Sequence, residues 1–338
     1  MGCMGGIIPF VASALPPRSN AGHSMTRSRH VAVRIDLARV RANAQAIRRR
    51  VGPDVGLIAV VKADAYGLGV ARVSEAIADV VDEFCVFNLE EAVEADLWTR
   101  TGRRTLTLAP PPSLDPNDYV SHGVRPAVVS AEQATALRAA GCVLCVDTGM
   151  QRFACPADEM GRALDAGGCD EAFTHAARPQ QVARLLEIVG GRRAGLRLHA
   201  AGTALLDDPA AWLDAVRPGL ALYRGAVRVA TPLVEVRDTN GPVGYTGFTP
   251  STGRHGVILA GYSNGLRPGP CVISGRPSRI LEVGMQSAYV ECGPRDRVGD
   301  EVVLLGDGLT EDTVAAAWHT TPQLVLVHLC AAGEREYI

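Results

Sequence analysis

The sequence lacks the features that mark a nucleic-acid-binding, membrane-spanning or disordered chain. Its 34 Lys and Arg residues nearly balance 36 Asp and Glu, which gives a formal net charge of −2, and no basic block is present. No apolar run approaches the roughly 18 residues of a membrane-spanning helix. Hydrophobic residues make up 47% of the 338 positions, enough to bury a large core. We therefore expect a globular protein with no nucleic-acid or membrane partner.

A disulfide framework is also missing. The nine cysteines are odd in number and scattered, as expected for reduced thiols in the cytoplasm. Cys142 and Cys145 have a C-x-x-C spacing, but they lie in an apolar run that predicts a strand. Residues three apart on a strand point to opposite faces, so we expect no metal there.

The N-terminus differs in composition from the rest of the chain. Residues 1–24 are rich in Gly, Pro, Ser and Ala, and no basic segment precedes the apolar stretch 6–15, so a signal peptide fits poorly. We expect residues 1–30 to be a disordered extension or the product of a start codon assigned too early.

Residues 55–225 alternate between short apolar runs and longer amphipathic segments. Helical patterns cover 70–81, 89–99, 131–140 and 180–189. The predicted strands are 56–61, 84–87, 105–109, 126–129, 143–146, 171–174, 196–199 and 219–223. Eight strands with helices between them predict an α/β fold, a (β/α)8 TIM-type barrel.

Beyond residue 229 the helical periodicity almost disappears. Gly and Pro separate short runs at 257–260, 270–274, 279–284, 288–292, 301–305 and 324–329, which predicts a C-terminal antiparallel β domain. We therefore assign 31–228 to the barrel and 229–338 to the β domain. A strand predicted at 31–36 could join the β domain, and a helix is expected at 37–50.

The most informative stretch is Val-Lys-Ala-Asp-Ala-Tyr-Gly-Leu-Gly, residues 61–69. Lys62 ends an apolar strand, and barrel enzymes place their chemistry at the C-terminal ends of strands. A lysine there can form a Schiff base with an aldehyde, although a lysine at a strand end can also be an ordinary surface residue.

This string resembles the pyridoxal-phosphate lysine motif of the alanine racemase family. Further motifs of that family follow in order: Asp-Thr-Gly-Met-Gln-Arg at 147–152, Thr-His at 174–175, His199, Arg-Pro-Gly-Leu-Ala-Leu-Tyr at 217–223, Gly-Tyr at 244–245, Gly-Tyr-Ser-Asn-Gly at 261–265 and Gly-Met-Gln at 284–286. The resemblance covers residues 31–338. It implies a barrel followed by a β domain, and a homodimer whose active sites are shared.

The resemblance also implies a role for each matching residue. Lys62 would hold pyridoxal 5'-phosphate and act as one base, and Tyr245 of the partner subunit would be the second. His175 would link that tyrosine to Arg217, which faces the pyridine nitrogen, and Arg152 would place the substrate carboxylate. The remaining expected contacts are Tyr66, Thr203, Gly219 and Leu220 for the cofactor phosphate, and Tyr262, Met285 and Gln323 for the substrate. Taken alone, Arg217 could be an arginine in an exposed loop, paired with a carboxylate such as Asp214.

Four positions depart from the family pattern. Cys145 replaces a lysine, often carbamylated in relatives, that helps to hold the neighbouring arginine. Asn264 and Gln286 replace aspartates, and Gln323 replaces a tyrosine that touches the phosphate and narrows the entry. We expect these changes to shift or broaden the substrate pocket, toward serine or a larger amino acid, without removing the chemistry.

The sequence therefore predicts an amino-acid racemase, with two alternatives. His328 and Cys330 would share a face of the strand predicted at 324–329, as metal ligands do in related D-amino-acid dehydratases and aldolases. A non-catalytic pyridoxal-phosphate-binding protein is the other alternative, although such proteins lack the β domain.

Overall fold

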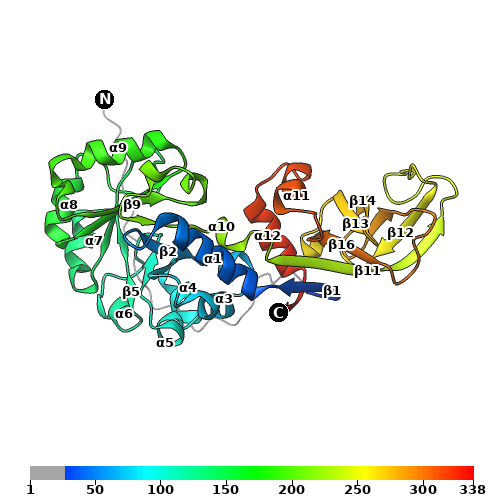
Figure 1. Cartoon of the computed structure of the whole chain (residues 1–338), viewed down its shortest axis with the longest axis horizontal. Coiled ribbons are helices and arrows are strands. Elements are labelled where there is room, and N and C mark those ends of the chain that lie inside the picture. The colour runs from blue at the N-terminus through cyan, green and yellow to red at the C-terminus, as the bar shows by residue number, and fades with distance from the viewer. Residues whose placement is uncertain (1–26) are drawn as a thin grey trace, which may run out of the picture.

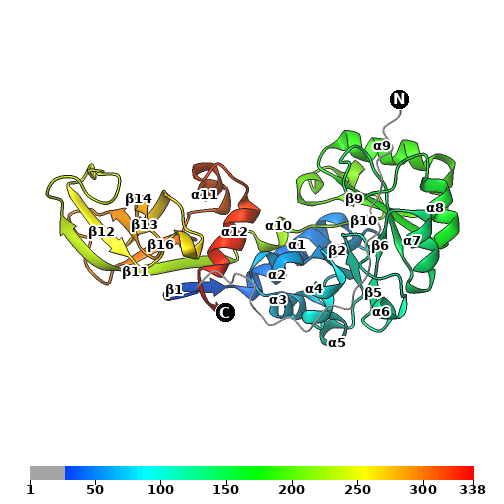
Figure 2. The ribbon, with the colours of Figure 1, turned by 180° about the vertical axis from the view of Figure 1, so that it is seen from behind.

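The computed structural model describes residues 27–338, which form a barrel and an elongated β domain side by side (Figures 1 and 2). Of the expected N-terminal extension, residues 1–26 lie outside the described residues. Residues 28–30 are not part of an extension, because strand β1 (Ser28–Ile35) already begins at Ser28. No helix in the described part is long and apolar enough to cross a membrane.

The parallel sheet forms the barrel. Its strand order is β5-β4-β3-β2-β10-β9-β8-β7-β6. The strands are β2 (Gly56–Val60), β3 (Glu83–Val86), β4 (Thr105–Thr107), β5 (Val124–Arg125), β6 (Ala127–Val128), β7 (Val143–Cys145), β8 (Glu171–Ala176), β9 (Arg197–Ala201) and β10 (Ala215–Val216).

Segments β5 and β6 are the two ends of this sheet and are separated only by Pro126. Strand β5 pairs with β4, and β6 pairs with β7. Because proline has no N–H to donate to a ladder, it divides one strand between two neighbours. The sheet therefore amounts to eight strand positions, as predicted for a barrel.

Most helices of the barrel cover its outside. The helices are α1 (Leu37–Val51), α2 (Lys62–Tyr66), α3 (Val70–Ile77), α4 (Leu89–Glu94), α5 (Leu97–Thr101), α6 (Asn117–Val120), α7 (Ala131–Ala136), α8 (Met160–Gly167), α9 (Pro179–Val189) and α10 (Leu220–Tyr223). The exceptions are α2 and α10, which contribute to the cavity at the C-terminal ends of the strands. The strand predicted at 219–223 is therefore wrong: those residues form α10, and the eighth strand is β10. A short buried apolar run does not distinguish a strand from a helix.

The second sheet forms the β domain, in the order β12-β15-β14-β13-β16-β11-β1-β17, with β12 also paired to β11. Its strands, besides β1, are β11 (Val227–Asp238), β12 (Arg254–Ile258), β13 (Gly269–Ile273), β14 (Arg276–Val283), β15 (Ala288–Glu291), β16 (Glu301–Leu305) and β17 (Gly333–Tyr337). All pairs are antiparallel except β1 with β17. Strand β1 thus lies in the sheet of the β domain, although helix α1, which follows it, covers the barrel.

Two helices interrupt this domain, α11 (Glu311–Ala317) and α12 (Pro322–Ala331). The strand predicted at 324–329 is wrong, because these residues are the centre of α12. The helix starts at Thr321, whose side chain accepts a hydrogen bond from the N–H of Leu324, with Pro322 in the first turn. Its apolar sequence suits a helix packed among α2, α11, β11 and β17, not a strand.

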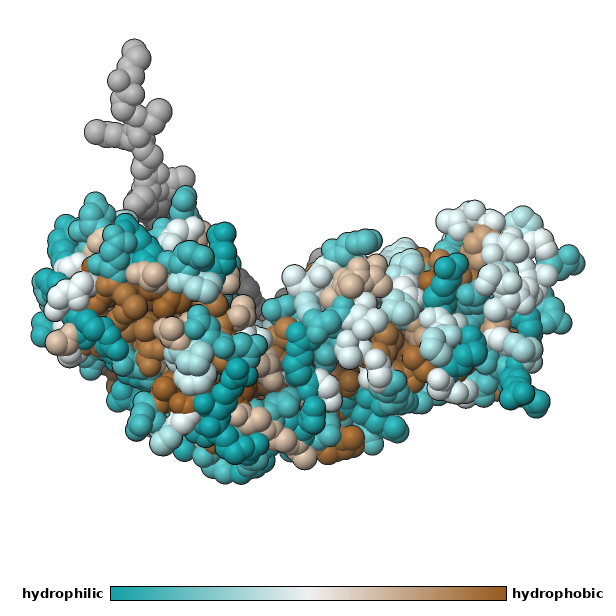
Figure 3. Space-filling view, turned by 45° about the horizontal axis from the view of Figure 1, so that its top comes forward, coloured by the Kyte–Doolittle hydropathy of each residue, from teal (hydrophilic) through white to brown (hydrophobic). Residues whose placement is uncertain are grey.

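The outline of the molecule is indented between the two parts (Figure 3). Apolar side chains gather on one face of the barrel, and most of the visible surface is hydrophilic. Within the barrel, an apolar layer of strand residues separates the two ends: Ile58, Val60, Cys85, Leu106, Ala127, Val143, Cys145, Phe173 and Ala215.

Candidate active site

Lys62 lies at the C-terminal end of β2, at the start of an unusual turn. Residues 63–66, none of them glycine, all have φ between 53° and 59°. Left-handed backbone costs about 1–2 kcal/mol per residue, so the turn needs support from its surroundings. Glu91 on α4 provides it, because its carboxylate accepts hydrogen bonds from the N–H groups of Ala63 (2.9 Å) and Phe87 (2.8 Å). The backbone around the lysine is thereby tied to the loop after β3.

Eight of the expected site residues line a single cavity of about 160 Å³ at the C-terminal ends of the barrel strands. They come from five separate segments of the chain, which the barrel brings together. These residues are Lys62, Tyr66, His175, Thr203, Arg217, Gly219, Leu220 and Gln323. A primary amine, a guanidinium, an imidazole and two hydroxyl groups therefore share one enclosed space.

The hydroxyl groups of this cavity lie at the turn before α10. Thr203 Oγ1 accepts hydrogen bonds from the N–H groups of Gly219 and Ala221, both at 3.2 Å. A methyl group on Gly219 would lie 2.2 Å from the Tyr66 hydroxyl, so only glycine allows this close approach. Burial, with the nearby Cys85, raises the pKa of Tyr66 to about 12, and its hydroxyl therefore stays protonated and can donate to an anion.

Arg217 is only 4% exposed and is held on three sides. One of its guanidinium nitrogens contacts Nδ1 of His199 and donates to the carbonyl oxygen of the same residue (3.2 Å). The other terminal nitrogen donates to the carbonyl oxygen of Thr174 (2.6 Å), and the ring of Phe173 lies 4.8 Å from the guanidinium carbon. Arg217 is therefore not a loop arginine paired with Asp214.

His175 is open to the cavity at the end of β8. Partial desolvation and the cations Arg217, Arg152 and Lys62 lower the pKa of His175 to about 4. The imidazole is therefore neutral near neutral pH and can both donate and accept one hydrogen bond.

Arg152 does not line the Lys62 cavity. It lies exposed on the loop after β7, in a neighbouring groove lined by residues such as Asp147 and Arg184. Cys145, the residue that replaces the expected lysine, is buried inside the barrel, and burial raises the pKa of its thiol to about 12. The side chain of Cys145 is neutral and does not reach out to position Arg152 by charge.

Three of the four expected site residues of the β domain lie away from the Lys62 cavity, which only Gln323 lines. Tyr245 is 93% exposed, and Tyr262 and Met285 are exposed as well; none of them lines the Lys62 cavity. Glu282 holds the loop of Tyr245, because its carboxylate accepts hydrogen bonds from the N–H groups of Tyr245 and Thr246, both at 2.8 Å, and from the Thr246 hydroxyl at 2.6 Å.

Two of the positions that depart from the family pattern, Asn264 and Gln286, lie in the same domain. Asn264 is buried, and its Oδ1 accepts a hydrogen bond from the N–H of Gly261 (3.0 Å), which closes the turn after Tyr262. Gln286 is exposed.

The shared face expected for His328 and Cys330 is wrong, and with it the geometry of a metal site there. Both residues lie on helix α12, where positions two apart point about 200° away from each other. Within residues 27–338, no group of three or more His, Cys, Asp or Glu residues is arranged to hold a metal ion.

The residues that support the site carry no motif and were not predicted from the sequence. Glu83, Arg125, Glu171 and Arg197 form buried ion pairs at the opposite end of the barrel, and Glu91 and Glu282 hold the loops of Lys62 and Tyr245. One signal was available: three of the four charged residues are the first residue of a barrel strand. Charge at the start of an apolar strand is unusual enough to indicate a buried network.

Known proteins share both the sequence pattern and the fold. The family described as "Alanine racemase, N-terminal domain" matches residues 35–227. The alanine racemase of Aeromonas hydrophila is 28% identical over 90% of this chain and 98% of its own length. The crystal structure of the biosynthetic alanine racemase of Pseudomonas aeruginosa is 28% identical, with a TM-score of 0.80 over 92% of this chain and all of that one.

A more distant structure has the same fold. The alanine racemase of Bartonella henselae, crystallised with covalently bound pyridoxal phosphate, is 22% identical, with a TM-score of 0.80 over 91% of this chain and 99% of that one. The match of the family over most of the barrel, together with the motifs gathered around Lys62, leads to one conclusion. The chain belongs to the alanine racemase family.

Proposed function

We propose that this chain is a pyridoxal-phosphate-dependent amino-acid racemase that interconverts the L and D enantiomers of a small amino acid. The observation that carries the proposal is the Lys62 cavity, which combines an amine, a buried guanidinium and two hydroxyl groups at the C-terminal ends of barrel strands. The names of its relatives support the reaction, and the Bartonella henselae enzyme supports the cofactor.

The residues of the cavity fit this cofactor. Lys62 offers the amine for covalent attachment, and Arg217 offers a cation for the pyridine nitrogen. The protonated Tyr66 hydroxyl, Thr203 and the turn at Gly219, where the Tyr66 hydroxyl occupies the space of a side chain, would form the cradle for the phosphate. When bound, pyridoxal phosphate would act as an electron sink that makes the α-proton of an attached amino acid acidic.

Racemisation needs one proton acceptor and one donor on opposite sides of the α-carbon. Lys62 Nζ serves one side, and Tyr245 of a second copy serves the other. Neutral His175 relays hydrogen bonds between that tyrosine and Arg217. Arg217 keeps its proton, because a guanidinium does not deprotonate in proteins, so it orients the ring nitrogen without protonating it. Arg152, which lies in the neighbouring groove, would help to place the substrate carboxylate.

A homodimer with shared active sites follows from this assignment. Tyr245 is 93% exposed and does not line the cavity of its own chain, which supports its use by a second copy. Tyr262 and Met285 are exposed on the same domain and would contact the substrate in the partner's site. We place the protein in the cytoplasm, in keeping with its eight described cysteines, all of them free.

Mixed dimers test the shared site. Lys62→Ala and Tyr245→Ala homodimers should both be inactive, whereas a heterodimer of the two variants carries one intact site and should recover part of the wild-type activity. The controls are the two variants taken separately through the same mixing procedure, and each should stay inactive. A verified heterodimer without activity would contradict shared sites.

Gln323 is the position that we propose to widen the substrate pocket. It lies in the first turn of α12 and lines the Lys62 cavity. Gln323→Tyr should narrow the entry and shift preference from larger amino acids toward alanine by about 10- to 200-fold, the range for methylene-sized differences in a pocket. A wild-type enzyme that racemises only alanine efficiently would refute the broadened pocket.

Proton exchange in heavy water is the decisive experiment for the reaction. The purified protein with pyridoxal phosphate is incubated with a panel of L- and D-amino acids, and deuterium at the α-carbon and chirality are measured together. We expect exchange and inversion for one or a few small amino acids, and neither in Lys62→Ala. Bound cofactor without exchange on any amino acid would instead support a non-catalytic pyridoxal-phosphate protein.

A further inference from the structure

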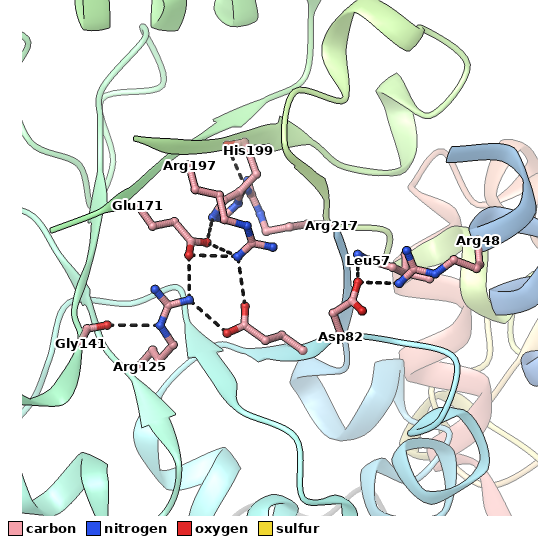
Figure 4. A network of polar contacts seen from close by, with 10 residues as sticks. Arg48, Leu57, Asp82, Arg125, Gly141, Glu171, Arg197, His199 and Arg217 are labelled. Carbon is pink, nitrogen blue, oxygen red and sulfur yellow. Dashed lines mark hydrogen bonds and ion pairs between the residues drawn. The ribbon is translucent and has the colours of Figure 1, made fainter. Parts of the chain in front are cut away.

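A chain of polar contacts runs through the barrel from Arg217 toward the opposite end (Figure 4). Nδ1 of His199 contacts Arg217, and Nε2 of His199 lies 2.8 Å from Oε1 of Glu171. No other described group offers a partner to this Nε2. We propose that Glu171 is a positioning residue that fixes the tautomer of His199 and, through it, the orientation of the Arg217 guanidinium.

The contacts of His199 leave only one tautomer. Burial and the neighbouring Arg217 lower the pKa of this fully buried imidazole to about 3, so the ring carries one proton at neutral pH. A guanidinium can only donate hydrogen bonds, so Nδ1 must be the acceptor. The single proton therefore lies on Nε2, toward a carboxylate that can only accept.

Glu171 is itself held in place as a carboxylate. Its Oε2 lies 2.8 Å from a guanidinium nitrogen of Arg125, and Oε1 lies 2.9 Å from one of Arg197. Burial alone would raise the pKa of Glu171, but the contact with His199 and the charges of Arg125 and Arg197 hold it well below its ordinary value. An ionised acceptor thus faces His199 across the physiological pH range.

Glu171→Gln reverses this arrangement with little change in volume. The amide has one acceptor oxygen, and two guanidiniums face it from Arg125 and Arg197. Oε2 of Glu171 accepts from both Arg125 (2.8 Å) and Arg197 (3.0 Å), so the amide oxygen takes its place. The NH2 group then takes the place of Oε1 and faces Nε2 of His199, which must accept. The proton moves to Nδ1, where it meets the N–H groups of Arg217, and the guanidinium has to shift.

Glu83→Gln is the matched control. Glu83 is buried in the same network and accepts a hydrogen bond from Arg125 (3.0 Å), but it does not contact His199. Both substitutions remove one negative charge next to Arg125. Only Glu171→Gln changes the partner of the imidazole.

The test is ¹⁵N nuclear magnetic resonance of histidine-labelled full-length protein, measured with and without pyridoxal phosphate, with the His199 signals assigned by their loss in His199→Gln. We expect the proton on Nε2 in the wild type and in Glu83→Gln, and on Nδ1 in Glu171→Gln. An unchanged tautomer in a folded Glu171→Gln, or the same change in Glu83→Gln, overturns the proposal.

The consequence for catalysis rests on the proposed racemase function and is measured separately. Glu171→Gln should lower kcat by about tenfold or more relative to Glu83→Gln, with little change in KM, because a misplaced guanidinium affects the reacting geometry more than substrate binding. Glu171→Asp, which keeps the charge and the acceptor, should restore the Nε2 tautomer and part of kcat. If the wild type racemises nothing, the proposed function fails while the resonance data still decide the tautomer.

Discussion

The close approach of Tyr66 to Gly219 gives the sharpest test of the phosphate cradle. In Gly219→Ala the added methyl group would lie 2.2 Å from the Tyr66 hydroxyl oxygen and 2.9 Å from the ring carbon that bears it. An ordinary contact begins at 3.4 Å, so the ring must move by about 1.2 Å. Tyr66 has little freedom to do so, because Tyr223 packs against it with ring centroids 5.0 Å apart.

Two effects should result from this substitution. Overpacking should reduce the free energy of unfolding by about 1–3 kcal/mol. Displacing the hydroxyl should also remove one hydrogen bond to an anion, about 1.5–3 kcal/mol, which corresponds to a loss of about 10- to 150-fold in pyridoxal-phosphate affinity. Fluorescence titration with the cofactor and urea denaturation of the cofactor-free protein measure the two effects independently.

Two further variants separate the clash from a general effect of alanine. Gly191→Ala is the control, since no atom lies within 4 Å of its added methyl group. In Gly219→Ala combined with Tyr66→Phe, the clashing oxygen is gone, so the unfolding free energy should recover in part while cofactor affinity stays low. Unchanged affinity in Gly219→Ala, with Gly191→Ala also unchanged, would refute the placement of the phosphate at this turn.

Three further predictions concern groups around the site. Arg125→Met should lower the free energy of unfolding by about 3–5 kcal/mol, because Glu171 loses one of its two guanidinium partners and Glu83 keeps only Arg197, at 3.8 Å. Urea denaturation measures this, and a loss under about 1 kcal/mol would contradict it. The pKa of His199 is lowered from 6.5 to about 3 in the folded chain, so the unfolded chain binds this proton more readily. The free energy of unfolding should therefore fall as the pH drops from about 6.5 toward 3, by at most about 1.4 kcal/mol per pH unit. His199→Gln should flatten this slope in acid denaturation. Glu282→Ala should free the Tyr245 loop and lower kcat by about tenfold or more, with unchanged cofactor affinity. A kcat equal to that of the wild type in steady-state kinetics would count against a role of Glu282 in holding this loop.

Much of the fold could be predicted from the sequence, because periodicity and turn residues carry local information. The errors fall on two short, mostly buried apolar runs. The runs at 219–223 and 324–329 have no polar face, so the spacing of their residues does not distinguish a helix from a strand. Contacts with the rest of the fold make both of them helical. The second helix could still have been found from Thr321 and Pro322, a start signal that the apolar run obscured.

The site shows a similar division. Motif residues on the barrel strands were predicted together and lie together, because strand ends of a barrel converge whatever their separation in sequence. Arg152 sits on the loop after β7, whose course is not fixed by the strand pattern, and here its side chain lies outside the cavity. The support residues could not be assigned, because a carboxylate such as Glu171 acquires its role only from partners 26 to 46 positions away in the chain.

The charge balance inside the barrel connects these supports with the proposed cofactor. Glu83 and Glu171 face Arg125 and Arg197, so these four charges cancel, and Arg217 adds one positive charge beyond them. The neighbouring Cys85 and Cys145 stay neutral, since burial raises the pKa of each thiol to about 12. The excess positive charge of this buried network is therefore on Arg217, where an anionic cofactor can balance it. Glu171 is the carboxylate that, through His199, keeps this guanidinium in place.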